Sequence, residues 1–202
     1  CFTMMQNMYK KEYSEMLKMF YGIHVSKIET ESGKYINSSP EPFLMLDLAI
    51  PNKSKPTLMD CMESYTEDEI LTGDNKVFNE ETNEKEDAIK QIRFWSLSDI
   101  LIITLKRFSN TGTKNNVNVD FPIEDLDLTK FIIGYNKDSY KYELYGICNH
   151  MGGVLGGHYT SYVKNSNNKW YHFNDQSVDE IDESEIKSEK AYCFFYRKKI
   201  IK

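Results

Sequence analysis

A histidine, an asparagine and an aspartate lie in one short stretch of the sequence, in an arrangement that could transfer protons. His158 follows the glycine-rich run 152–157 and is predicted to begin a strand, and Asn174 and Asp175 lie at the end of the next predicted strand. Histidine is the usual proton carrier near neutral pH. A neighbouring carboxylate or amide can fix its tautomer, which gives the base and the orienting group of a Cys-His-Asn/Asp constellation. On spacing alone, a structural role for a histidine beside glycines is the more common alternative.

The thiols that could complete such a site are scattered along the chain. The four cysteines are Cys1, Cys61, Cys148 and Cys193. They contain no C-x-x-C pair, and with the four histidines they show no metal-ligand spacing. A disulfide scaffold would need denser cysteine, so we expect reduced thiols and a cytoplasmic or nuclear protein.

Antiparallel strands are the elements that must position these residues. A polar hairpin tip at 165–168 separates the strand that carries the histidine from the strand that ends in the asparagine. Alternating or apolar runs predict strands at 88–95, 100–108, 117–121, 140–148, 158–164, 170–173 and 191–196. The second half of the chain is therefore expected to be mainly an antiparallel sheet, within an α+β fold.

The first half of the sequence mixes helices with short strands. Amphipathic spacing predicts a helix over 4–21, and a second helix is predicted within 56–65 with Thr57 as its N-cap. Alternation broken by turns predicts strands between 23 and 50, and the apolar run 43–48 suggests a strand that is buried on both faces. The polar stretch 78–87 is expected to form a loop or a hairpin tip.

Composition excludes several classes of partner. The chain of 202 residues has a formal net charge of −6 and no basic stripe, which disfavours nucleic-acid binding. No apolar run approaches the roughly 20 residues that cross a bilayer, so we expect no membrane association.

Five motifs in order along most of the chain carry a family resemblance. The chain resembles the ubiquitin-specific proteases, which are papain-like cysteine deubiquitinases. The matching stretches are Trp95–Phe108 with its Leu-Lys-Arg-Phe ending, Val119–Pro122, Tyr145–Tyr162, Trp170–Val178 and Ala191–Arg197.

The resemblance implies a hand-like fold of thumb, fingers and palm. It implies a remnant of a thumb helix at 1–21, fingers and adjoining palm elements at 22–95, and the palm at 96–202, with most of the thumb missing. The implied partners are ubiquitin and ubiquitinated proteins.

The resemblance also implies roles for individual residues. His158 falls on the general base, Asn174 on the third catalytic position, and Asp175 on the next polar position, which supports catalysis in some members. Gly157 and Tyr159 would border the narrow channel for the Gly-Gly tail of ubiquitin. The amide of Asn174 is neutral and adds no full charge to stabilise the imidazolium of His158, whereas the carboxylate of Asp175 could supply that charge. We therefore expect Asp175→Ala to impair turnover at least as much as Asn174→Ala.

The chain departs from the family pattern where many members hold zinc. The four positions of the two Cys-x-x-Cys pairs are occupied by Glu29, Ser32, Asn79 and Thr82. None is a soft zinc ligand of the usual kind. We therefore expect no structural zinc and no other cofactor, and fingers that are held by packing and strand pairing.

The nucleophile is not at its expected place. Cys1-Phe2 resembles the Cys-aromatic pair of the family's Cys box, but the rest of that box is absent, so a plain chain-end residue is the favoured interpretation of Cys1. Cys61, Cys148 and Cys193 lie within predicted elements, where buried structural thiols are expected. The nucleophile is therefore expected outside this chain, and a separate segment with the Cys box is a possible partner.

Three other interpretations stay open at this point. The chain could be an inactive scaffold that binds ubiquitin, or a papain-like hydrolase that acts on a ubiquitin-like modifier. The third is an unrelated α+β domain with a coincidental histidine, and the presence of five motifs in order argues against it.

Overall fold

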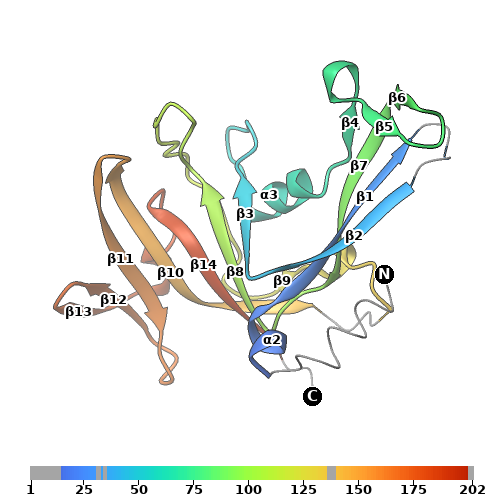
Figure 1. The fold of residues 1–202 in the computed structure, drawn as a ribbon. Coiled ribbons are helices and arrows are strands. Elements are labelled where there is room, and N and C mark those ends of the chain that lie inside the picture. Colours follow the sequence, from blue (N-terminus) through green and yellow to red (C-terminus); the bar gives the residue numbers. More distant parts are fainter. Residues whose placement is uncertain (1–14, 31–32, 34–35, 136–139, 200–202) are drawn as a thin grey trace. The chain divides into compact units, whose positions relative to one another are not determined.

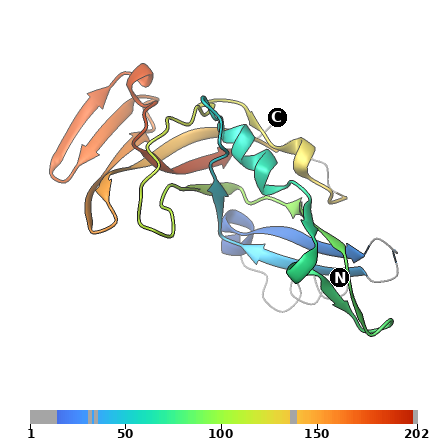
Figure 2. The same cartoon turned by 90° about the horizontal axis from the view of Figure 1, so that it is seen from above.

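The computed structural model describes residues 15–30, 33, 36–135 and 140–199, and these residues form two compact units. The first unit comprises the described parts of 1–43, 66–98 and 129–138, and the second comprises those of 44–65, 99–128 and 139–202. Each unit has its own sheet (Figures 1 and 2). None of the helices in these described ranges is long and apolar enough to cross a membrane.

The first unit is a four-stranded sheet with a small hairpin. Its strands run in the order β2-β1-β7-β4, and β5 pairs with β6. The elements are α2 (Glu15–Phe20), β1 (Gly22–Thr30), β2 (Ile36–Phe43), β4 (Glu69–Leu71), the short helix η1 (Gly73–Asn75), β5 (Val77–Asn79), β6 (Glu84–Glu86), β7 (Ala88–Ser96) and the short helix η2 (Thr129–Phe131). The strands expected in 23–43 and 88–95 are confirmed. Of the helix predicted over 4–21, residues 4–14 lie outside the described residues.

The polar stretch at 78–87 forms the β5–β6 hairpin, and the side chain of Asn79 organises its turn. Asn79 is fully buried; its Nδ2 donates to Glu86 Oε1 at 2.9 Å, and its Oδ1 accepts from the backbone N–H of Glu81 at 2.9 Å. Thr82 Oγ1 donates to the same Glu86 oxygen at 2.7 Å. Asn79 and Thr82 occupy two of the positions considered for zinc, and their hydrogen bonds hold this turn.

Removing this amide should weaken the first unit. We expect Asn79→Ala to lower the free energy of unfolding by about 1–2 kcal/mol, because the fully buried amide makes two hydrogen bonds that each contribute roughly 1 kcal/mol. Urea denaturation followed by circular dichroism measures the change. The exposed neighbour provides the control, since Glu80→Ala should shift the stability by less than about 0.5 kcal/mol. Equal effects of the two substitutions would contradict this role for Asn79.

The second unit is built on an eight-stranded sheet in the order β13-β12-β11-β10-β14-β8-β3, with β9 paired to β10. All its pairs are antiparallel except β3 with β8. The elements are β3 (Met45–Ala49), α3 (Leu58–Tyr65), β8 (Ile100–Lys106), β9 (Leu126–Asp127), β10 (Lys141–Gly153), β11 (Gly156–Lys164), β12 (Trp170–Asn174), β13 (Ser177–Ile181), the short helix η3 (Glu183–Glu185) and β14 (Ala191–Lys198). The strands that carry the candidate site thus lie next to one another.

The core of the second unit lies on one face of this sheet. Helix α3 begins as predicted, because Thr57 Oγ1 accepts from the backbone N–H of Asp60 at 3.1 Å and the Asp60 carboxylate accepts from the backbone N–H of Thr57 at 2.8 Å. The core comprises Leu46, Leu48, Leu58, Met62, Leu101, Ile103, Phe121, Leu144, Ile147, Phe194 and Tyr196. The opposite face carries half-exposed side chains.

Two sequence predictions for this unit are wrong, and two strands, β9 and β13, were missed. Strand β3 is not buried on both faces, because Leu46 and Leu48 are buried whereas Met45 is exposed. Residues 117–121 form no strand, because the backbone of Asp120 bonds to Pro56 and Leu58 at the start of α3 rather than to a strand. Strand β13 is acidic and exposed at the edge of the sheet, so no apolar pattern marked it.

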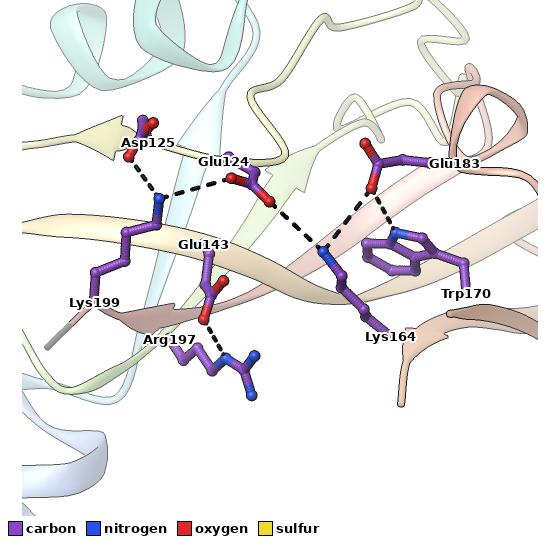
Figure 3. Close-up of polar contacts among 8 residues, drawn as sticks. All are labelled: Glu124, Asp125, Glu143, Lys164, Trp170, Glu183, Arg197 and Lys199. Carbon is purple, nitrogen blue, oxygen red and sulfur yellow. Dashed lines mark hydrogen bonds and ion pairs between the residues drawn. The ribbon is translucent and has the colours of Figure 1, made fainter. Parts of the chain in front are cut away.

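A chain of charged contacts links the strands of this unit beyond their backbone pairing (Figure 3). Lys164, at the end of β11, lies 3.7 Å from a Glu124 oxygen and 4.0 Å from a Glu183 oxygen, and the indole N–H of Trp170 donates to that Glu183 oxygen at 3.1 Å. Lys199 contacts Asp125 at 2.6 Å after β14. Partly exposed pairs contribute little singly, but together they tie β11, β12 and β14 at the ends remote from the candidate site.

Candidate active site

The structure brings His158 and Asn174 into direct contact. His158 is near the start of β11, and Asn174 is the last residue of β12. Because β11 and β12 are antiparallel, with Ser161 opposite Phe173, the start of one strand lies beside the end of the other. His158 Nε2 is 2.6 Å from Asn174 Oδ1. The neighbouring-strand arrangement predicted from the sequence is therefore present.

This contact determines which ring nitrogen of His158 carries the proton. The carbonyl oxygen of an amide only accepts hydrogen bonds, so Nε2 must be the donor. In the neutral ring the lone pair then lies on Nδ1, which is able to take a proton from a thiol. The asparagine thus orients the ring and selects its tautomer.

Asp175 lies next to this pair in a tight turn. It is the first residue of the two-residue turn between β12 and β13, which Asn174 and Ser177 close, and its φ of 51° lies in the left-handed region that aspartate tolerates. One carboxylate oxygen is 4.0 Å from His158 Nε2, and the side chain is 79% exposed. Asp175 is therefore placed to act on the ring through its charge rather than through a direct hydrogen bond.

Glycines make the β10–β11 hairpin possible. Gly152 has a φ of 108°, and a Cβ there would lie 2.7 Å from the carbonyl oxygen of Gly156. A Cβ on Gly157 would overlap His150 Nε2 and would lie 2.7 Å from the carbonyl oxygen of Met151. Gly157 and the ring of Tyr159 are exposed on either side of His158. On the Gly157 side, a backbone surface without side-chain bulk therefore flanks the histidine.

The described thiols are poor nucleophiles. Burial raises the pKa of Cys61 to about 11 and that of Cys193 to about 12. Burial also raises the pKa of Cys148. All three are free thiols; Cys61 and Cys193 are buried as predicted, whereas Cys148 is only half-buried. At neutral pH all three are protonated. Cys1 lies outside the described residues.

The thiol environment predicts slow alkylation. At neutral pH we expect Cys61, Cys148 and Cys193 of the folded chain to react with iodoacetamide at least about tenfold more slowly than in the urea-unfolded chain, because thiolate is the reactive form. The rates should rise as pH is raised toward the folded-state pKa values. Mass spectrometry of peptides from timed quenches measures each site. A native rate above the unfolded rate at any of the three would overturn this assignment.

The positions considered for zinc hold other contacts. Glu29 accepts from Lys27 Nζ at 2.5 Å, and Asn79 and Thr82 belong to the hairpin hydrogen bonds. Ser32 lies outside the described residues. Across the described ranges no group of three or more His, Cys, Asp and Glu side chains is arranged to hold a metal ion.

His150 was not among the predicted site residues. It lies on β10 opposite Tyr159, it is 3% exposed, and it is one of the few buried polar residues in the part of the chain that the structure describes. Its spacing was the signal that could have identified it. His150 lies seven residues before Gly157, and in a short hairpin this spacing places it on the strand that pairs with the strand of His158.

Comparisons with known proteins agree with this geometry. A family model described as ubiquitin carboxyl-terminal hydrolase matches residues 3–196. Ubiquitin carboxyl-terminal hydrolase 9 of Arabidopsis thaliana is 44% identical over 146 residues, which are 70% of this chain and 16% of that protein. Ubiquitin carboxyl-terminal hydrolase 15 of Homo sapiens is 40% identical over 152 residues, which are 73% of this chain and 16% of that protein.

Solved structures show the same fold. The structure of the SAGA Ubp8/Sgf11/Sus1/Sgf73 DUB module bound to ubiquitin aldehyde contains a chain that superposes with a TM-score of 0.82 at 31% identity, covering 96% of this chain and 44% of that one. The prediction of a ubiquitin-specific protease fold, mainly antiparallel with few helices, is confirmed. The chain spans about 16% of the length of the curated relatives named above. It belongs to the ubiquitin carboxyl-terminal hydrolase family.

Proposed function

We propose that this chain supplies the general base of a cysteine deubiquitinase that cleaves the bond after the C-terminal glycine of ubiquitin. The observation that carries the proposal is the 2.6 Å contact between His158 Nε2 and Asn174 Oδ1, which leaves the Nδ1 lone pair free for a thiol. Family membership and a matched chain in a structure bound to ubiquitin aldehyde support the substrate.

The proposed reaction uses the ring of His158 first as a base and then as an acid. His158 Nδ1 accepts the thiol proton of the nucleophile, and the thiolate attacks the carbonyl carbon of the last glycine. The resulting imidazolium then gives its proton to the leaving amine, so that the carbon–nitrogen bond breaks and a thioester remains. A water molecule, deprotonated by the same ring, releases ubiquitin from the thioester.

The exposed backbone beside His158 suits a glycine tail. A Cβ at Gly157 is excluded by His150 and by the carbonyl oxygen of Met151, so this wall of the site stays flat. A slot with backbone walls admits glycines and rejects larger side chains. We assign Gly157 and Tyr159 to the surface that faces the last two glycines of ubiquitin.

The nucleophile is proposed to lie outside the described residues, because the three described thiols are protonated at neutral pH. This same observation favours a second candidate function, an inactive scaffold that binds ubiquitin without cleaving it.

Ubiquitin with a C-terminal electrophile distinguishes the two functions. For the full-length protein we expect a covalent adduct whose mass-mapped cysteine is none of Cys61, Cys148 and Cys193. Ubiquitin without its last two glycines is the control and should not react. Saturable binding without an adduct would establish the scaffold, and the absence of both binding and adduct would overturn the ubiquitin assignment. Parallel reactions with electrophiles of ubiquitin-like modifiers identify the preferred modifier.

A further inference from the structure

The β10–β11 hairpin contains a second histidine for which the proposed chemistry has no use. His150 lies directly across from Tyr159, the residue that follows His158. Its ring is buried, and its Nδ1 has no hydrogen-bond partner among the described residues. An unpaired polar atom in a buried ring costs stability, so stability does not account for a histidine at this position.

The backbone of Gly157 rests on this ring. A Cβ at Gly157 would overlap His150 Nε2 and lie 3.1 Å from His150 Cδ2, so the glycine Cα is in close contact with the Nε2–Cδ2 side of the imidazole. Gly157 is joined by one peptide bond to His158. Any residue that fixes the position of the Gly157 backbone within β11 therefore also fixes the point from which the His158 side chain starts.

The ring of His150 also packs against the ring of Tyr159. The two ring centroids are 4.7 Å apart with a tilt of 44°, and Tyr159 remains 56% exposed. Tyr192 and Phe108 pack around His150 at centroid distances of 5.7 Å and 5.6 Å. The inner face of Tyr159 is therefore held by His150 and its aromatic neighbours, while its outer face is open to solvent.

The main chain of His150 is anchored on two sides. Its N–H donates to the carbonyl oxygen of Lys190 at 2.9 Å, and its own carbonyl oxygen accepts from Lys114 Nζ at 2.7 Å. Burial and, next, the charge of Lys114 lower the pKa of the His150 ring. Both effects favour the neutral form of the ring.

We propose that His150 is a positioning residue: by supporting Gly157 and Tyr159 it fixes the backbone on both sides of His158 and shapes the surface that faces the ubiquitin tail. This inference rests on the proposed function for the tail, but the effect on His158 does not depend on ubiquitin. Shape is the property required of His150, so a flat ring of similar size should replace it and a branched or small side chain should not.

Three variants and one control test the proposal. His150→Phe keeps a flat ring and removes the unpaired nitrogen, His150→Leu keeps apolar bulk without flatness, and His150→Ala removes the support. The matched control is His172→Ala on β12, because His172 packs on Tyr162 at a similar centroid distance of 5.1 Å. Differential scanning fluorimetry reports the stability of each variant.

The first readout is the imidazole of His158 in the full-length protein without ubiquitin, observed by 1H–15N NMR. We expect wild type, His150→Phe and His172→Ala to show His158 as the Nε2–H tautomer. His150→Leu and His150→Ala should show exchange-broadened or shifted His158 resonances, because the starting point of the side chain is no longer fixed. This measurement needs no ubiquitin, so it stands even if the proposed function fails.

The second readout is hydrolysis of a ubiquitin–fluorophore amide by the full-length protein. A displacement of about 1 Å costs on the order of 100-fold in rate, so His150→Leu and His150→Ala should lower kcat by about 10- to 100-fold with a smaller change in KM. His150→Phe should stay within about threefold of wild type, with equal or higher thermal stability. If His150→Ala does not fold, His150→Leu decides.

The outcomes separate the two proposals. A folded His150→Leu variant with wild-type His158 resonances and wild-type kcat would overturn the positioning role. Loss of function in His150→Phe, despite a stable fold, would also overturn it, since the nitrogens rather than the shape would then matter. A wild-type protein that neither binds nor cleaves ubiquitin would refute the proposed function and leave the NMR test of His150 intact.

Discussion

Replacing His158 by glutamine is expected to lower kcat/KM for a ubiquitin–fluorophore amide by about a thousandfold in the full-length protein, while ubiquitin binding is retained. General acid–base catalysis contributes about 10²- to 10⁴-fold, and the proposed mechanism uses this ring in both steps. Binding should survive because the side chain is 45% exposed and its hydrogen bond is to Asn174, so its loss leaves the core intact.

A neighbouring histidine supplies the control for this variant. His172 lies on β12, where its ring packs on Tyr162, and His172→Gln should keep kcat/KM within about threefold. Stopped-flow or plate-reader kinetics measure turnover, and isothermal titration measures ubiquitin affinity. If His158→Gln retained more than about a tenth of wild-type turnover, another group would be the general base. The role proposed for His158 from its Nε2–H tautomer would then be wrong.

Most of the candidate site was predictable because its residues share one hairpin. His158 and Asn174 are 16 residues apart, and the polar tip between two short strands predicts that they are antiparallel neighbours. Local turn chemistry and period-two alternation are enough to place two such residues at one edge of a sheet. The 2.6 Å contact is the geometric result of that pattern.

The errors arise where a distant segment or backbone pairing alone decides the structure. Residues 117–121 alternate like a strand, but the backbone of Asp120 bonds to the segment that starts α3, more than fifty residues earlier. Strand β13 has no apolar alternation because it is an exposed edge strand that is held by its backbone pairing to β12. Propensity and pattern cannot report a partner that lies far away in the sequence.

His150 shows the same limit at the candidate site. In the sequence it lies two residues beyond the strand predicted at 140–148, and its type suggested no role. Its importance depends on what lies across the hairpin, because the contact with Gly157 exists only when the register places Gly152 opposite Gly157 and Tyr159 opposite His150. A close contact between a ring and a backbone becomes visible only once that register is known.

Removing the carboxylate of Asp175 is expected to impair turnover at least as much as removing the amide of Asn174. The amide holds the neutral ring, but the imidazolium that forms during the reaction needs a negative charge, and the Asp175 oxygen is 4.0 Å from Nε2. Two unit charges about 4 Å apart interact by about 1 kcal/mol in water and about 4 kcal/mol at an effective dielectric near 20. Since Asp175 is 79% exposed, the lower part of this range applies, which corresponds to about a tenfold loss of kcat/KM in Asp175→Ala.

The two substitutions should not be independent. When Asn174→Ala removes the direct acceptor, the Asp175 carboxylate is close enough to turn toward Nε2 and replace part of the lost orientation. The double variant should therefore lose more than the product of the two single losses, as is common for residues that share one partner. A double variant with only the multiplied effect would show that the two side chains act separately.

The turn must be separated from the charge in this experiment, because Asp175 has a left-handed φ that alanine adopts poorly. Asp175→Gly relieves that strain and Asp175→Asn tolerates it, and both remove the charge, so all three variants should lose turnover to a similar extent. Asn168→Ala, at another left-handed position in the β11–β12 tip, should leave turnover unchanged. Because the Asp175 carboxylate is exposed, the ratio of wild-type to Asp175→Asn turnover should shrink as salt is raised from roughly 0.05 to 1 M.

A loss of turnover in Asp175→Ala alone, and not in Asp175→Gly or Asp175→Asn, would identify the backbone turn, and not the charge, as the contribution of Asp175.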